Sequence, residues 1–174
     1  IGIVTNQTGL LKDRTFLVDF LVKNDIKIKT IFAPEHGFRG DADAGEHVKN
    51  GVDTKTRISI ISLYGNNKKP TSEQLKGIDL VLFDIQDVGV RFYTYISTLT
   101  YVMEAAAENN LEVIVLDRPN PHDGYIDGPV LKNQWKSFIG MHNIPIVYGL
   151  TIGEYGKMVN GEKWLNKGSQ AKYT

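Results

Sequence analysis

The chain has 174 residues and a mass of 19.5 kDa, with 41% hydrophobic and 23% charged residues. This balance suits one globular domain and excludes disordered and low-complexity classes. Twenty basic and twenty acidic residues leave no basic excess for nucleic-acid binding, no apolar run reaches the roughly 18 residues of a membrane span, and the lack of cysteine excludes disulfides and thiolate chemistry.

Short apolar runs alternate with helical patterns along the chain. Runs rich in Ile, Val, Leu and Phe span residues 1–5, 26–33, 58–64, 80–84 and 112–117, with a sixth candidate at 144–148. Several lack polar alternation, which is typical of strands buried on both faces of a parallel sheet. Residues 16–21 and 96–106 carry apolar residues at helical spacing, and Thr71 and Thr151 each begin a capping-box pattern. The alternation predicts a layered α/β fold with right-handed crossovers.

Polar loops follow the predicted strands. In parallel α/β folds, ligands bind beyond the carboxyl ends of the strands, where such loops converge. The five loops span residues 6–9, 34–40, 65–70, 84–95 and 117–121, and four of them are dense in Asn, Gln, Asp, Glu, His, Arg and Tyr. They predict a polar-ligand site at one edge of the sheet, with carbohydrate as a leading ligand class.

Glu35 is the first candidate catalytic residue. It follows Pro34, which fixes its own backbone φ angle, and precedes His36 and Gly37, a glycine that allows a sharp turn. A carboxyl group held at such a corner could act as a general acid. The alternative is that Glu35 closes the loop through hydrogen bonds to nearby backbone amides.

Asp84 and Asp87 are candidates for a second carboxylate. Asp84 ends an apolar run, and Gln86 shares its face by the period-two alternation of a strand. Glycoside hydrolysis usually requires a pair of carboxylates that flank the scissile bond. The alternative is structural: either aspartate could cap the following helix or pair with Arg91.

Three arginines lie in these loops, namely Arg39, Arg91 and Arg118. The guanidinium group suits bidentate recognition of a carboxylate or phosphate on a ligand. The alternative is pairing with neighbouring acids. Near Arg91, the aromatic residues Phe92, Tyr93 and Tyr95 could offer a stacking face for a sugar ring or belong to the core.

The sequence predicts neither a metal site nor a nucleotide cofactor. The histidines are scattered at His36, His47, His122 and His142, without a paired helical spacing. Asp41, Asp43 and Glu46 are clustered, but the calcium-loop pattern is absent. No glycine-rich phosphate loop or nucleophile elbow is present either.

Four long strings carry a family resemblance. They are Ile3-Val-Thr-Asn-Gln-Thr-Gly9, Phe32-Ala-Pro-Glu-His-Gly-Phe-Arg-Gly40, Phe83-Asp-Ile-Gln-Asp-Val-Gly-Val-Arg-Phe-Tyr-Thr-Tyr-Ile96 and Leu116-Asp-Arg-Pro-Asn-Pro121. With shorter strings up to residue 154, they resemble a bacterial family that was long catalogued as a domain of unknown function. That family is now associated with exo-acting β-N-acetylmuramidases, which release terminal N-acetylmuramic acid from peptidoglycan fragments. One departure is Ala33, where the resemblance leads us to expect Ser.

The resemblance implies a Rossmann-like three-layer domain with a mainly parallel sheet and helices on both faces. In the family this N-terminal domain precedes a smaller C-terminal domain, and the cleft lies between them. We assign residues 1–160 to the first domain and expect residues 161–174 to begin a linker toward the second. The first residue is not Met and the last residues are polar, as expected for a piece of a longer protein.

The resemblance also implies the roles of individual residues. The proposed catalytic glutamate of the family maps to Glu35, which would protonate the glycosidic oxygen. Asp84 or Asp87 would activate water or stabilise the developing positive charge, unless the 2-acetamido group of the substrate assists instead. Arg39 or Arg91 would bind the lactyl carboxylate that distinguishes N-acetylmuramic acid from N-acetylglucosamine. The remaining pocket residues would be Asn6, His36, Gln86, Tyr93 and Asn120.

The implied function is therefore an exo-β-N-acetylmuramidase that acts on peptidoglycan-derived saccharides in cell-wall turnover or recycling, without a cofactor. One alternative is a non-catalytic domain that binds cell-wall glycans. Another is a phosphosugar- or nucleotide-handling enzyme, which the absence of a glycine-rich loop disfavours. The location of the substrate predicts export to the cell envelope or the extracellular space, although no signal sequence is visible.

Overall fold

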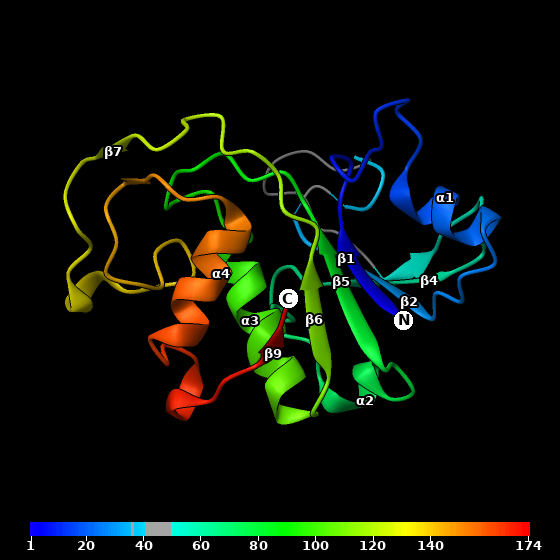
Figure 1. The fold of residues 1–174 in the computed structure, drawn as a ribbon. Helices are drawn as coiled ribbons and strands as arrows, with labels where there is room; N and C mark the ends of the chain where they lie inside the picture. Colours follow the sequence, from blue (N-terminus) through cyan, green and yellow to red (C-terminus); the bar gives the residue numbers. More distant parts are fainter. Residues whose placement is uncertain (36, 41–49) are drawn as a thin grey trace.

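The computed structural model describes residues 1–35, 37–40 and 50–174, and within this part seven strands form one sheet (Figure 1). The strands are β1 (Gly2–Thr5), β2 (Thr30–Ala33), β3 (Gly51–Val52), β4 (Ser59–Ser62), β5 (Leu80–Asp84), β6 (Glu112–Val115) and β9 (Lys172–Tyr173). Their spatial order is β3-β4-β2-β1-β5-β6-β9, and each neighbouring pair is parallel except β3 with β4. The mainly parallel α/β sheet predicted from the sequence is confirmed.

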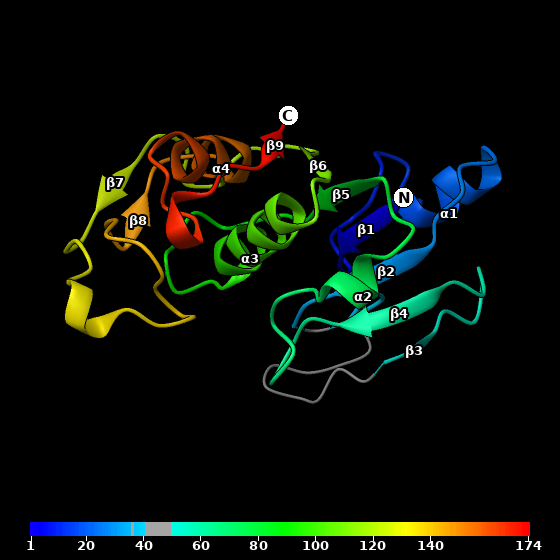
Figure 2. The same ribbon diagram turned by 90° about the horizontal axis from the view of Figure 1, so that it is seen from below.

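Alternate residues of the central strands point to opposite faces, and each face has its own core. Val4, Phe32 and Phe83 pack in one apolar cluster with the helices α3 (Tyr95–Glu108) and α4 (Ile152–Gly161). Ile3 and Ile31 pack on the other face with α1 (Leu17–Lys23). Figure 2 shows α1 on one side of the sheet and α3 on the other. The three-layer arrangement with helices on both faces is therefore present.

The predicted helix starts form by the predicted mechanism. Thr71 precedes α2 (Ser72–Leu75) and Thr151 precedes α4, and each threonine side chain accepts a hydrogen bond from the third helical residue. The side chains of Gln74 and Glu154 accept a hydrogen bond from the threonine backbone in return. Both capping boxes are thus complete, and they satisfy amide groups that the helix itself leaves unpaired.

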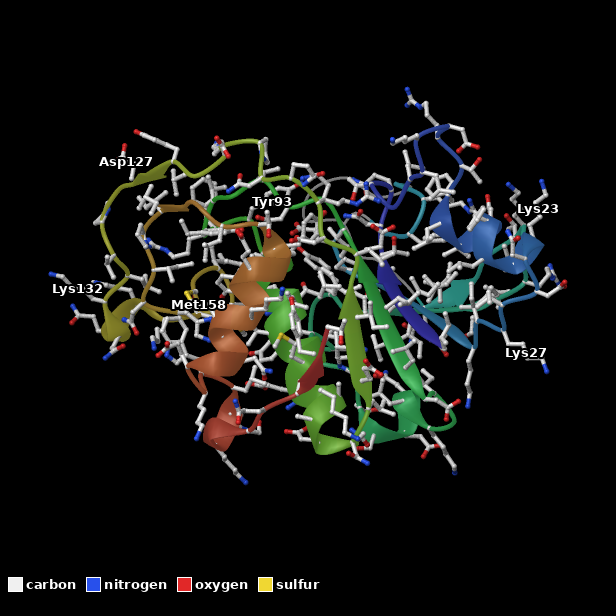
Figure 3. The ribbon with its side chains drawn as sticks, viewed as in Figure 1. Lys23, Lys27, Tyr93, Asp127, Lys132 and Met158 are labelled. Atoms are coloured by element: carbon white, nitrogen blue, oxygen red, sulfur yellow. The ribbon has the colours of Figure 1, made fainter. Side chains whose placement is uncertain are left out.

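The sixth predicted strand differs from the expectation. Of residues 144–148, only β8 (Val147–Tyr148) is a strand, and it pairs with β7 (Ile126–Asp127) in a separate two-stranded ribbon. Pro145 has no backbone N–H to donate to a ladder, which shortens the strand. The ribbon belongs to a long irregular segment that also holds the 3₁₀ turn η1 (Asn133–Trp135). Figure 3 shows Asp127 and Lys132 on the outer side of this segment, away from the sheet.

Residues after 160 pack against the domain. Leu165 and Ala171 are buried in the larger core, on either side of the turn η2 (Asn166–Gly168). β9 then pairs with β6, and the Tyr173 hydroxyl donates to the Gly153 carbonyl (2.9 Å). This differs from the linker expected for residues 161–174, because the few apolar side chains that anchor the segment form no pattern in the sequence. None of the described helices is long and apolar enough to cross a membrane.

Candidate active site

The loops that follow the parallel strands meet at one edge of the sheet, at the top of Figure 1. Asn6 follows β1, Glu35 follows β2, and residues 64–70 follow β4. Residues 85–94 connect β5 to α3 and include Tyr93, which lies at this edge in Figure 3. The convergence predicted from the sequence is therefore present.

Glu35 lies in the wall of a cavity of about 680 Å³ at this edge. The cavity is lined by Glu35, Tyr64, Gly65, Lys68, Phe92, Thr94, Ser137, Phe138 and Ile139. Its walls thus come from the loops after β2 and β4, from the start of α3 and from the long segment around η1. The volume and the mixture of aromatic and hydroxyl groups suit a small polar ligand with apolar faces, such as a sugar.

The backbone around Glu35 makes the rigid corner that the sequence predicts. Pro34 directly follows the buried strand β2, and its carbonyl accepts a hydrogen bond from the Gly37 amide (3.1 Å). Gly37 has a φ angle of +73°, which residues with a side chain rarely adopt. The short turn presents the half-buried Glu35 side chain at the cavity.

The charge of Glu35 acts on a buried tyrosine hydroxyl. Tyr95, the first residue of α3, is 2% exposed, and its ring meets that of Tyr93 edge to face at 4.8 Å. Burial raises the pKa of Tyr95 well above its usual value, and the neighbouring Tyr93 hydroxyl and the negative charge of Glu35 raise it further. The hydroxyl therefore stays protonated and able to donate.

The Tyr95 hydroxyl and the Asn6 amide nitrogen are both buried, and neither makes a hydrogen bond of good geometry to a described residue. The Tyr93 and Asn6 side chains are the polar neighbours of the Tyr95 hydroxyl. The Asn6 side-chain carbonyl oxygen accepts from the backbone and hydroxyl of Thr8 (2.9 and 2.5 Å). Buried polar groups without partners are rare in proteins and concentrate where a ligand binds or a reaction takes place.

Asp84 forms an ion pair instead of lining the cavity. Its side chain is 2% exposed and contacts Arg118 through two guanidinium nitrogens, at 2.7 and 2.8 Å. Burial raises the pKa of Asp84, and the hydrogen bond and charge of Arg118 oppose that rise. The structural alternative considered for this residue is thus what the structure shows, with Arg118 as the partner in place of Arg91.

Asp87 is also held by the protein. It is 5% exposed and accepts hydrogen bonds from the Tyr148 hydroxyl and from the Gly89 amide (2.8 Å). Burial raises the pKa of Asp87, and these hydrogen bonds partly offset the effect. The contacts join the loop after β5 to the strand β8.

The sequence of the chain matches the family described as exo-β-N-acetylmuramidase NamZ, N-terminal, over residues 1–173. The chain belongs to this family. The resemblance found over residues 1–160 is therefore confirmed, and the match continues through β9.

Relatives of known name and structure agree with this membership. The chain is 51% identical over 164 residues to the peptidoglycan β-N-acetylmuramidase NamZ of Bacillus subtilis (strain 168), covering 93% of this chain and 40% of the relative. Two crystal structures of DUF1343 family proteins from Bacteroides fragilis NCTC 9343 superpose with TM-scores of 0.90 and 0.87. The first is 43% identical to the chain and the second 42%. Each match covers 99% of this chain, which corresponds to 43% of the first structure's chain and 45% of the second's. The chain thus spans less than half the length of each of these relatives.

The two arginines predicted to bind a ligand carboxylate form hydrogen bonds to other groups of the same domain. Arg39 forms hydrogen bonds to Asp53 (2.7 and 2.9 Å) and Asp19 (3.0 Å), and its guanidinium carbon lies 4.8 and 4.6 Å from the ring centres of Phe16 and Phe38. The hydrogen bond from Arg39 holds the pKa of Asp53 well below its usual range. Arg91 donates to the carbonyls of Pro129 (3.0 Å) and Ile144 (2.5 Å), which anchors the long segment to the sheet edge.

Gln86 and Asn120 also tie loops together. The Gln86 amide donates to the carbonyls of Asp87 (2.7 Å) and Pro119 (2.9 Å). Asn120 donates to the Leu150 carbonyl (3.0 Å) and lies in a separate hollow beside Thr151. The predicted pocket residue His36 lies outside the described residues.

Several cavity residues were not singled out by the sequence patterns. Lys68 lies in the polar loop 65–70 that follows a predicted strand, whereas Tyr64 ends that predicted strand and Phe138 belongs to a segment that bears no catalytic motif. Phe92, one of the aromatic residues that could stack on a sugar ring, lines the cavity with 58% of its surface exposed. The site therefore combines the predicted Glu35 with walls that only the folded chain reveals.

Proposed function

We propose that the protein is an exo-acting glycosidase that releases terminal N-acetylmuramic acid from peptidoglycan fragments, with Glu35 as the general acid. The observation that carries the proposal is the position of Glu35. Among the described residues that line the cavity it is the only carboxylate, it stands at a rigid turn, and its charge acts on the buried Tyr95 hydroxyl. Membership of the family and the name of the Bacillus subtilis relative support the same substrate class.

In the proposed reaction, the protonated Glu35 carboxyl gives its proton to the glycosidic oxygen as the bond to C1 breaks. Positive charge then develops on the sugar ring and must be compensated. Asp84 and Asp87 would have to leave Arg118 and Tyr148 before either could act there. Assistance by the 2-acetamido group of the substrate needs no such rearrangement, and we favour it.

The cavity walls supply the remaining requirements for a sugar. Phe92, Tyr64 and Phe138 offer apolar surface for the face of a pyranose ring. Thr94 and Ser137 provide hydroxyl groups that can exchange hydrogen bonds with sugar hydroxyls. Among the described residues no group of three or more acidic or histidine side chains is placed to hold a metal ion.

The proposed substrate also implies a compartment. Peptidoglycan and its fragments occur in the cell envelope and its surroundings. We therefore propose that the protein acts in the envelope or outside the cell, in turnover or recycling of the wall.

The test is hydrolysis by the full-length protein of a chromogenic β-N-acetylmuraminide and of the matching β-N-acetylglucosaminide. We expect release from the muraminide, and a fall of about 10²- to 10⁴-fold in Glu35→Gln, the range expected for loss of a general acid. Glu73→Gln is the matched control, because Glu73 is 85% exposed on α2 and lies outside the cavity. Muropeptide binding without release from either glycoside would contradict the proposal and indicate a glycan-binding domain.

A further inference from the structure

Among the described residues in the wall of the Glu35 cavity, one is a cation, and it is a lysine. Lys68 follows β4 and lines the cavity, and its ammonium group lies 4.8 Å from the centre of the Phe138 ring. Arg39, Arg91 and Arg118 are absent from this wall and bind groups of the domain itself. Lys68 is thus the cation that a ligand beside Glu35 would meet among the described residues.

The backbone on both sides of Lys68 is fixed. The Asn67 side chain donates to the Ser62 carbonyl (2.7 Å) at the end of β4. Lys69 binds Glu104 (3.2 Å) and Glu108 (2.8 Å) on α3. These anchors leave the Lys68 side chain directed to the cavity while its sequence neighbour faces the helix.

The Phe138 ring beneath the Lys68 ammonium group is also held in place by a neighbouring ring. The Phe138 ring stacks on Tyr101 of α3, with 5.8 Å between ring centres and 15° between planes. A lysine over an aromatic face is attracted by the ring but keeps its N–H groups for other acceptors. No carboxylate in the described part of the chain forms an ion pair with Lys68. Its charge is therefore available to a ligand.

We propose that Lys68 binds the carboxylate of the 3-O-lactyl group of the terminal muramoyl residue and thereby selects this sugar over N-acetylglucosamine. The inference rests on the function proposed above and assigns the selectivity for the acidic sugar to one residue. The two sugars differ by the lactyl ether, whose carboxylate is the only charge on the monosaccharide. A hydrogen bond between ammonium and carboxylate is worth about ten- to hundredfold in affinity when solvent is partly excluded.

Kinetics with Lys68→Met in the full-length protein test the proposal. The lactyl carboxylate is present both in the bound substrate and in the transition state. Loss of the contact between this carboxylate and position 68 should therefore raise KM and leave kcat nearly unchanged. We expect KM for the muraminide to rise at least tenfold, with partial recovery in Lys68→Arg. Lys76→Met is the control, because Lys76 is 76% exposed beyond α2 and should keep the wild-type KM. An unchanged KM in Lys68→Met, or a loss of kcat alone, would overturn the proposal.

A binding measurement separates this proposal from the proposed hydrolysis. Calorimetry compares N-acetylmuramic acid with its neutral methyl ester, and it requires no turnover. We expect the wild type to bind the acid at least tenfold more tightly than the ester, and Lys68→Met to bind the two alike. That result supports Lys68 as the carboxylate ligand even if the glycoside assay shows no hydrolysis. Equal affinity of the wild type for acid and ester, or an undiminished preference in Lys68→Met, would refute it even in an active enzyme.

Discussion

At the scale of single residues, the Tyr95 hydroxyl is a polar group whose burial packing alone does not explain. It is buried without a hydrogen bond of good geometry to a described residue, and the charge of Glu35 acts on it. A hydroxyl in that state costs stability unless a ligand or a reacting group uses it. We infer that its role is at the site.

Tyr95→Phe should therefore separate stability from activity. Removing an unpaired buried hydroxyl should leave the free energy of unfolding unchanged or raise it, whereas turnover of the muraminide should fall roughly tenfold or more. Tyr173→Phe is the matched control. Its hydroxyl donates to Gly153 and neither residue lines the cavity, so the loss of this hydroxyl should cost about 1 kcal/mol and leave turnover intact. Urea denaturation and steady-state kinetics on both variants measure this, and a Tyr95→Phe variant that unfolds more easily but turns over normally would disprove the inference.

The partners of the loop arginines could not be predicted from the sequence. A loop arginine predicts an anion-binding group, but its partner depends on which acids the fold brings near. Asp53 and Asp19 reach Arg39 from segments 14 and 20 residues away in sequence, and Asp84 reaches Arg118 across 34 residues. The position of Glu35 at a turn after β2 could be predicted because its Pro and Gly neighbours fix the backbone locally, whereas its catalytic role stays a prediction.

At the scale of elements, the buried contact between Asp87 and Tyr148 joins the loop after β5 to β8. The Tyr148 amide also donates to the Gly89 carbonyl (3.3 Å), so the two segments are tied by main chain and side chain together. This tie holds the long segment against the sheet edge, and that segment supplies one wall of the cavity.

Tyr148→Phe should weaken this tie in a pH-dependent way. Burial raises the folded-state pKa of Asp87 above its usual 3.8, so the ionised carboxylate lowers stability as the pH rises above that value. Tyr148 offsets this by donating to the ionised form, and its loss should cost about 1.5–3 kcal/mol at pH 7. At pH 3, where Asp87 is protonated in both states, the cost should fall to about 1 kcal/mol. Urea denaturation of wild type and variant at the two pH values tests this, and a larger cost at pH 3 would contradict it.

Some strands and helix starts could be predicted from the sequence, and others could not. Five predicted strands are present because buried parallel strands are long apolar runs, and both predicted capping boxes form because they depend on residues three apart. The sheet that residues 144–148 join, and the strands β3 and β9, depend on pairing across the fold. Two-residue strands have no periodicity to detect.

At the scale of the whole molecule, residues after 160 complete the fold. β9 extends the sheet beyond β6, and Leu165 is 2% exposed in the larger core. This placement makes the last strand part of the domain that carries the Glu35 cavity. That a second domain follows remains a prediction.

Leu165→Ala should show the contribution of this segment. A buried leucine truncated to alanine loses packing and leaves a cavity, at a cost of about 2–5 kcal/mol. The control is Val130→Ala, since Val130 is 55% exposed and its truncation should cost less than about 0.5 kcal/mol. Thermal and urea denaturation measure both, and equal stability of the two variants would mean that the segment behaves as a linker.

The most direct test of the central claim is a crystal structure of the full-length Glu35→Gln protein with an uncleaved muraminide. The account predicts the glycoside in the cavity after β2, with its glycosidic oxygen about 3 Å from the side chain at position 35 and its lactyl carboxylate on Lys68. A ligand bound elsewhere, such as in the hollow beside Asn120 and Thr151, with the Glu35 cavity empty at saturation, would contradict the account.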